Sequence, residues 1–579
     1  MTLRSLWTGL AGTTAIAGAL SLMAGAAFGQ SFCGNGQKGM GPFLTSSIGQ
    51  WQTAALTDEA PPLWDNLGDL HYPVTTSSPE AQAYFDQGLR LAYGFNHAEA
   101  RRAFRHAQRL DRDCALCYWG EALVLGPNIN APMSPDALGP ALLALGKAKE
   151  AAHASAKERA LIDALAARYS SDPQAERPAL DMAYAEAMVA VAAHFPDDLD
   201  IAVLTAEALM DTQPWDYWAF NDDGSTTAKG RTEEMIALLE EVLEASPDHP
   251  GAIHLYIHMV EASDAPERAE PYADRLAAQM PGAGHIVHMP SHIYVRVGRY
   301  VDSIKANKDA VVADEAFFAE VEDESIYRGG YYPHNVHFVL TSAQMAGDGE
   351  TTIEFAEKLA GVIDDEIAST VAWVQPIKAA PYFAHAQYSD PDSVLALADP
   401  GDRFPYIKGA WHYARGVAYA AKGEAKLATD EANAVYEIAT NADLSFMVEN
   451  YVPGDQLLEI AHHVVLGRIA QQQADFDGAV EQFKKAALIE DLMPYMEPPF
   501  WYYPVRQSLG AALLQAGRPE AAAEAFEASL KRVPNNGWAL YGLSEAQKAM
   551  GDAAGAKASE AALAQAWIGP RDLLELSKL

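Results

Sequence analysis

The chain has 579 residues, of which 49% are hydrophobic and 21% charged, and this balance excludes wholesale disorder. Its length also excludes one ordinary globular core, so several domains or a repeat array are expected. The formal net charge of −37 repels nucleic-acid backbones and anionic membranes, and it favours cationic partners such as metal ions or basic peptides.

The first 29 residues have the layout of a secretory signal peptide. Arg4 supplies a short positive start, residues 10–27 are small and apolar, and Ala27-Phe28-Gly29 is a small-residue cleavage site. No later stretch reaches the roughly 18 apolar residues that a membrane span needs, so we expect no membrane insertion of the mature chain. We predict that it is secreted across the inner membrane and is soluble in the periplasm or outside the cell. Residues 30–78 are predicted to form a mostly irregular extension.

Residues 79–134 contain an internal repeat with a period of 34 residues. Residues 81–88 (AQAYFDQG) align with residues 115–122 (ALCYWGEA). A repeat of this length indicates a helical solenoid, in which small residues let neighbouring helices approach and aromatic residues fill the gaps. The residues that continue the first copy, and their counterparts near the C-terminus, are Ala100, Phe104, Ala107, Leu509, Gly510, Gly517, Ala522, Phe526 and Pro534.

These residues resemble the signature of the tetratricopeptide repeat (TPR) family, which has two antiparallel helices per repeat. The resemblance implies an all-α fold: a right-handed superhelical solenoid of TPR-like helix pairs, here with several long aromatic and Pro-rich loops. It also implies a concave groove that binds ligands, because TPR proteins mostly mediate protein interactions. After residues 79–134, we expect degenerate helical repeats at 135–249, histidine-rich repeats at 250–366, a helical connector at 367–408 and C-terminal repeats at 409–579.

Two of the three cysteines, Cys114 and Cys117, stand three residues apart. In an oxidising compartment they could pair and leave Cys33 alone, while a redox site, an incidental role and metal contact are alternatives. Phe85 and Trp119 occupy the same position in the two repeat copies, and we expect them to line the start of the ligand groove.

Five segments between the predicted helices are longer and richer in aromatic residues and proline than TPR turns require. One of them contains Trp215 and Trp218, which we predict to line the ligand groove. Such loops often carry function, although they also serve to cover the ends of an array. The five segments are 127–135, 214–227, 327–333, 373–382 and 495–504.

Two pairs of histidines follow the repeat period. His254 and His258 are four residues apart, as are His288 and His292, and the pairs are separated by 34 residues. Residues four apart share one face of a helix. We therefore predict that the two pairs occupy equivalent places on neighbouring helices. The resemblance to TPR proteins implies that these places face the groove.

A further set of histidines repeats a second spacing. His285 and His288 lie 13 and 10 residues before a glycine that ends the predicted helix, and so do His334 and His337. Pro290 leaves open whether His285 stacks with the others.

These histidines point to a metal site. Packed helices lie about 8–10 Å apart, so imidazoles from two helices can meet, and neutral imidazole is a preferred ligand of Zn, Cu, Fe and Ni. We predict a transition-metal site, with Zn or Cu first, whereas inherited polar packing or direct contact with a ligand is the alternative. The predicted metal ligands are His254, His258, His285, His288, His292, His334 and His337.

Three hypotheses of function follow from this site. We predict a periplasmic TPR-repeat binding or scaffold protein that holds a peptide, a protein or a small molecule in its groove. The alternative is a metal-dependent enzyme with Glu261 as the general base, and metal storage or delivery is a third idea. An enclosed pocket capped by residues 214–227 would favour the enzyme, and an open groove would favour the scaffold.

Overall fold

The computed structural model describes residues 59–172, 174–221 and 224–579, and the predicted signal peptide lies outside this part of the chain. Residues 59–78 contain no helix or strand, which agrees with the irregular extension expected there. None of the helices in the described part combines the length and the apolar character that crossing a bilayer requires.

The N-terminal half of the molecule consists of antiparallel helix pairs. The first helix begins where Ser78 caps it and Pro79 occupies its first turn, a favourable start because proline has no N–H to leave unsatisfied. The helices are α2 (Pro79–Tyr93), α3 (His97–Leu110), α4 (Ala115–Val124), α5 (Leu138–Glu150), α6 (Ala156–Ala166), α7 (Arg177–His194), α8 (Leu199–Met210) and α9 (Thr232–Ala245).

The central helices carry the histidines. Two of them end at Gly298 and Gly347, whose φ angles of 77° and 83° suit glycine, as the sequence spacing predicts. The helices are α10 (Pro250–Val260), α11 (Glu270–Gln279), α12 (Gly284–His288), α13 (Pro290–Val297), α14 (Tyr300–Glu320), α15 (Tyr332–Ala346) and α16 (Gly349–Val362).

The C-terminal part continues the helical array to the end of the chain. Its helices are α17 (Asp365–Thr370), α18 (Val374–Tyr388), α19 (Pro391–Leu395), α20 (Pro405–Ala421), α21 (Ala425–Asn441), α22 (Ser445–Glu449), α23 (Gly454–Gln472), α24 (Phe476–Glu490), α25 (Val505–Gln515), α26 (Pro519–Arg532), α27 (Gly537–Met550) and α28 (Ala553–Ala566). The predicted all-α solenoid of helix pairs is confirmed.

One hairpin departs from the helical pattern. Strands β1 (Trp218–Phe220) and β2 (Thr226–Ala228) pair antiparallel inside the segment predicted as a loop, with Trp218 opposite Ala228. The aromatic and β-branched residues of these short runs favour extended backbone, so the loop forms a small ribbon beside the helices.

The repeat signature explains how closely the helices pack. A Cβ atom on Gly88 of α2 would lie 2.7 Å from the ring of Phe104 on α3, and one on Gly120 of α4 would lie 2.5 Å from it. The buried ring therefore fills a gap that exists only because both neighbours are glycine.

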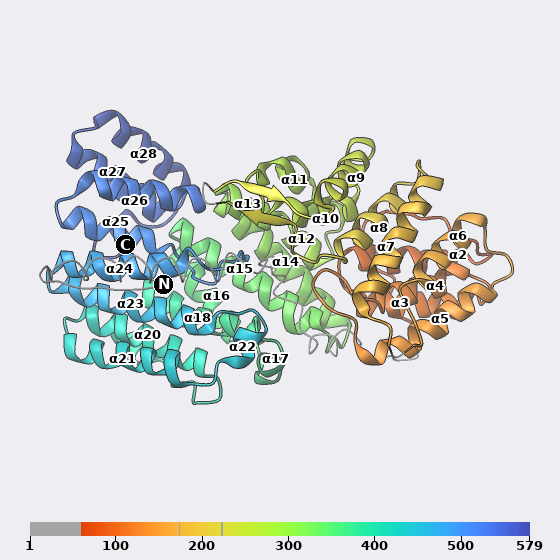
Figure 1. Ribbon diagram of the computed structural model, residues 1–579, viewed down its shortest axis with the longest axis horizontal. Coiled ribbons are helices and arrows are strands. Elements are labelled where there is room, and N and C mark those ends of the chain that lie inside the picture. The colour runs from red at the N-terminus through yellow and green to blue at the C-terminus, as the bar shows by residue number, and fades with distance from the viewer. Residues whose placement is uncertain (1–58, 173, 222–223) are drawn as a thin grey trace, which may run out of the picture.

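The C-terminal helices fold back onto the central ones. Figure 1 shows α2–α8 at one end of the molecule, α20–α28 at the other, and α10–α15 between them. Trp538 of α27 donates to the carbonyl of Gln344 at 2.9 Å, and the hydroxyl of Tyr300 donates to the carbonyl of Pro534 at 2.9 Å. This return brings the segment after α24 to the centre of the molecule.

Candidate metal centre

The seven predicted histidines lie on four neighbouring helices and are all buried, none more than 4% exposed. Pro290 begins α13, so the helix is interrupted at Met289 and does not run continuously from α12 into α13. His254 and His258 lie on α10, His285 and His288 on α12, His292 on α13, and His334 and His337 on α15.

Three of these histidines form the first triad: His254, His258 and His285. Their ligand nitrogens all lie within 4.8 Å of one another. The Nε2 atom of His254 is 3.1 Å from Nε2 of His258 and 3.2 Å from Nε2 of His285. His285, whose stacking the sequence left open, is thus part of the cluster.

The second triad consists of His288, His292 and His334, whose ligand nitrogens also lie within 4.8 Å of one another. The Nε2 atoms of His288 and His292 are 2.9 Å apart. The two triads are neighbours, because the ring centroids of His258 and His292 are 5.6 Å apart.

Hydrogen bonds determine which nitrogen carries the proton in two histidines of the first triad. Nδ1 of His254 is 2.6 Å from the carbonyl oxygen of Tyr93, and Nδ1 of His258 is 2.8 Å from a carboxylate oxygen of Glu261. A carbonyl and an ionised carboxylate only accept, so both Nδ1 atoms donate and both Nε2 atoms carry a lone pair.

The second triad is arranged in the same way. Nδ1 of His292 is 2.7 Å from the other carboxylate oxygen of Glu261, and Nδ1 of His288 is 2.5 Å from Oδ1 of Asn307. The amide of Asn307 is oriented by its Nδ2, which donates to the carbonyl of Ser303 at 2.8 Å. When both rings are neutral, both Nε2 atoms of this pair are therefore also bare.

Facing lone pairs repel, so each arrangement requires a proton or a metal ion between the nitrogens. Burial lowers the pKa of His254, His285, His288 and His334 well below 6.5, and the charges of neighbouring histidines lower it further. Protons are thus disfavoured on these four rings. Nitrogens bound about 2.0–2.1 Å from one ion lie about 3 Å from each other, which is the separation seen in both pairs.

Glu261 contacts one histidine of each triad and is completely buried. Burial alone would raise its pKa, yet the charges and hydrogen bonds of His292 and His258 lower the pKa to about 2. The same contact acts on His292: burial lowers its pKa, but Glu261 outweighs burial and the pKa is raised. Both carboxylate oxygens face Nδ1 atoms, a position suited to orienting ligands.

His337 lies apart from both triads. Its ring packs edge-on against Tyr502 with centroids 5.2 Å apart, and neither ring nitrogen has a hydrogen-bond partner within the described part of the chain. Burial lowers its pKa to about 3. The structure therefore does not bring His337 together with the other six, because its ring packs against Tyr502 instead.

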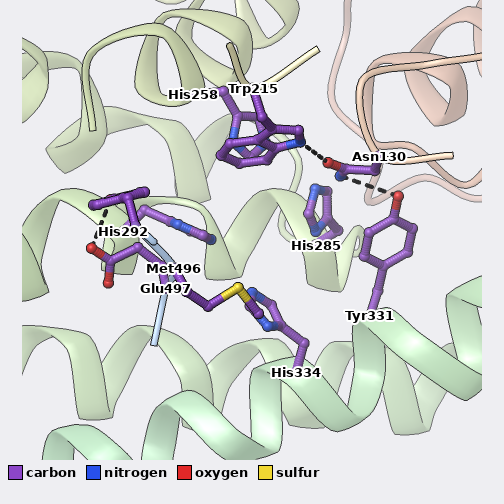
Figure 2. A pocket seen from close by; sticks show the side chains of 10 residues that line it. Asn130, Trp215, His258, His285, His292, Tyr331, His334, Met496 and Glu497 are labelled. Carbon is purple, nitrogen blue, oxygen red and sulfur yellow. Dashed lines mark hydrogen bonds between the residues drawn. The ribbon is translucent and has the colours of Figure 1, made fainter. Parts of the chain in front are cut away.

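A small cavity opens between the triads. It leaves about 20 Å³ for the centre of a water molecule, enough for one such molecule. Four of the five loops singled out in the sequence supply its walls, and Figure 2 shows these side chains around the histidines. The lining residues are Asn130, Trp215, His258, His285, His292, Tyr331, His334, Tyr495, Met496 and Glu497.

The loop residues hold one another in place. Trp215 packs edge-on against His258 at 5.1 Å and donates through Nε1 to Oδ1 of Asn130 at 3.1 Å. Asn130 donates to the hydroxyl of Tyr331 at 3.2 Å, and the ring of Tyr331 lies 4.7 Å from His285. Tyr331 ends a π-helical turn, an irregularity frequent at functional sites.

Two aromatic residues at the site have positive φ angles. Phe95 has φ 55° and Trp215 has φ 60°, a conformation uncommon outside glycine. Phe95 stacks near the first triad, with its ring centroid 4.4 Å from that of His254. Strained backbone concentrates at functional sites, so both residues support this location.

Other predicted site residues lie elsewhere. Phe85 and Trp119 are buried in the core, 0% and 1% exposed, so they do not line a groove. They occupy the packing position between helices, where aromatic residues fill gaps. Trp218 donates to the carbonyl of Met259 at 2.7 Å and does not line the cavity. Cys114 and Cys117 form a disulfide at the start of α4.

Several residues at the site were not found from the sequence. Phe95, Asn307 and the carbonyl of Tyr93 carry no motif, since their roles depend on contacts between distant segments. Glu497 and Met496 lie in a loop that the sequence singled out, so its aromatic and Pro-rich composition was a usable signal.

Comparison with known proteins identifies the repeat. A sequence model described as a tetratricopeptide repeat matches residues 513–565, from the end of α25 to α28. This match covers the last helices of the array, and it agrees with the resemblance seen at Ala522 and Phe526. A search of curated proteins found no match for the chain.

Solved TPR structures share the helical arrangement only at low similarity. The human IFIT1 dimer with m7Gppp-AAAA is 12% identical, with a TM-score of 0.28, over 85% of this chain and 91% of that one. The P58(IPK) TPR domain is also 12% identical, with a TM-score of 0.20, over 81% of this chain and 98% of that domain. We draw nothing about function from this likeness.

Proposed function

We propose that this TPR protein binds two transition-metal ions, one in each histidine triad. The proposal is carried by two pairs of facing Nε2 atoms, 3.1 Å apart in His254 and His258 and 2.9 Å apart in His288 and His292. In all four rings Nδ1 already has a hydrogen-bond acceptor. Zinc and copper suit a ligand set made only of imidazole, and copper stands highest in the general affinity order. Met496, which lines the cavity, adds a soft thioether at the same place.

The test is a titration of metal-free protein with Zn²⁺ or Cu²⁺, followed by removal of loose metal and elemental analysis. We expect two ions per chain and a higher unfolding temperature, because ligands that bind only the folded state stabilise it. Less than one retained ion per chain with either metal would reject the proposal.

The small size of the cavity favours an enzyme over an open scaffold. The triads face a space for one water-sized molecule, covered by Trp215 of the 214–227 segment and by residues 495–497, not a wide groove. Three protein ligands per ion leave a position for a small molecule, as in catalytic metal sites. A peptide or protein would then bind elsewhere on the solenoid.

Azide tests whether these positions are open. In copper-loaded protein we expect azide to produce a new charge-transfer absorption band, and the double variant His254→Ala/His288→Ala, treated identically, should give none. If azide does not change the spectrum of the copper-loaded protein, the ions have no open coordination position and serve a structural role.

The export of the chain remains a prediction from its first 29 residues. The disulfide between Cys114 and Cys117 supports an oxidising compartment, because such bonds are rare in the cytosol.

A further inference from the structure

Glu261 is the structural link between the two triads. It is the first residue after α10, so the same helix that presents His254 and His258 also presents this carboxylate. One oxygen accepts from Nδ1 of His258 at 2.8 Å and the other from Nδ1 of His292 at 2.7 Å.

We propose that Glu261 is a shared positioning residue that makes the two metal sites interdependent, rather than a general base. This inference rests on the proposed metal function. A base needs a free oxygen facing the reactant, whereas both oxygens of Glu261 face ligand histidines. The hydroxyl of Tyr495, which donates to Glu497 at 2.6 Å, also lies 3.3 Å from the Glu261 oxygen that faces His292.

The physical reason for interdependence is the tautomer of each ring. A ligating Nε2 must be bare, so the proton must stay on Nδ1, and a hydrogen-bond acceptor opposite Nδ1 keeps it there. Glu261 offers two such acceptors at once. An amide of the same shape offers one acceptor and one donor, so it can serve only one of the two histidines.

The other second-triad contact provides a matched control. Asn307 accepts from Nδ1 of His288, and its remaining hydrogen bonds are to Ser291 and Ser303, which belong to neither triad. A change at Asn307 should therefore weaken metal binding only in the triad of His288, His292 and His334. A change at Glu261 should instead weaken the ion that binds later, in whichever triad that is.

The experiment measures stepwise Zn²⁺ affinities of the full chain with Glu261→Gln. We expect the first ion to bind within a few-fold of wild type and the second to bind 10–100-fold more weakly, the usual effect of losing such a partner. In the backgrounds His254→Ala and His288→Ala, which retain one complete triad each, Gln can turn its carbonyl to the surviving site. There the same substitution should change affinity only a few-fold.

Three outcomes would overturn the inference. In the first, Glu261→Gln binds both ions with wild-type affinity. In the second, it weakens the binding of both ions equally. In the third, it lowers the affinity of the single-triad backgrounds as much as it lowers the affinity for the second ion. If wild type itself binds no metal, the proposed function fails instead.

A second variant covers the case in which Glu261→Gln does not fold, as judged by circular dichroism. Glu261→Asp keeps two acceptors on a shorter side chain, so both hydrogen bonds lengthen together. We expect both ions to weaken by a similar factor, and a change confined to one ion would reject the shared role.

Discussion

Replacing one histidine in each triad should remove the metal ions one at a time. His254→Ala should leave a single ion in the second triad, His288→Ala a single ion in the first, and the double variant none. Structural zinc binding is worth about 10–16 kcal/mol over four ligands, so each ligand contributes about 3 kcal/mol, more than a hundredfold in affinity. The measurement is metal content per chain after dialysis against a weak chelator.

His337→Ala is the control for this series. It removes a buried imidazole of the same size from α15, but one that packs against Tyr502 outside both triads. It should keep two ions, and far-UV circular dichroism should show unchanged helicity in every variant. Retention of two ions in His254→Ala or His288→Ala, or loss from His337→Ala, would show that the triads are not the metal sites.

Glu497→Gln should stabilise the metal-free protein at alkaline pH and not at acid pH. Glu497 lines the cavity, is 7% exposed, and accepts from the hydroxyl of Tyr495 at 2.6 Å, while its other oxygen has no partner among the described residues. Burial raises its pKa from 4.5 to about 7. Arg296, His292 and the Tyr495 hydrogen bond oppose this rise, and Glu261 adds to it.

Proton uptake by Glu497 decides in which direction folding stability changes with pH. Between about pH 4.5 and 7 the unfolded chain ionises Glu497 while the folded chain keeps it protonated, so the folded state loses stability as pH rises through this window. A shift from 4.5 to about 7 corresponds to about 3 kcal/mol above pH 7, since one pKa unit is about 1.4 kcal/mol. Gln does not titrate and avoids this penalty.

Denaturant unfolding at pH 8 and pH 5 provides the measurement. The gain in unfolding free energy on Glu497→Gln should be larger at pH 8 by about 2–3 kcal/mol, and any constant effect of the amide cancels in this difference. Glu524→Gln, on an exposed position of α26, should change stability little and equally at both pH values. An equal effect of Glu497→Gln at the two pH values would contradict the buried, protonated carboxyl.

Local spacing was enough to predict the helices and their histidine pairs. The 34-residue period placed His254 and His258 on one helix and His288 and His292 in the next unit, and the glycines at 298 and 347 ended helices as expected. These features depend on residues three to four apart and on repeat length, which a sequence displays directly.

The division of the histidines into two triads was decided by tertiary structure. His285 joins α10 across the bundle, whereas His337, at an equally regular spacing, packs against Tyr502. Spacing places a side chain on a face of its helix, but the rotation of neighbouring helices decides which faces meet.

The sequence by itself determined an acidic helical repeat with histidines at matching places in successive units, because composition and period are local properties. Only the tertiary structure decided that the cluster is buried and that Glu261 joins its halves. It also decided that the loop carrying Glu497 lines the cavity. That loop lies more than 200 residues from α10 and reaches it because the C-terminal helices pack back against α14 and α15. Contacts over such separations depend on the summed geometry of every intervening helix pair, which no local pattern records.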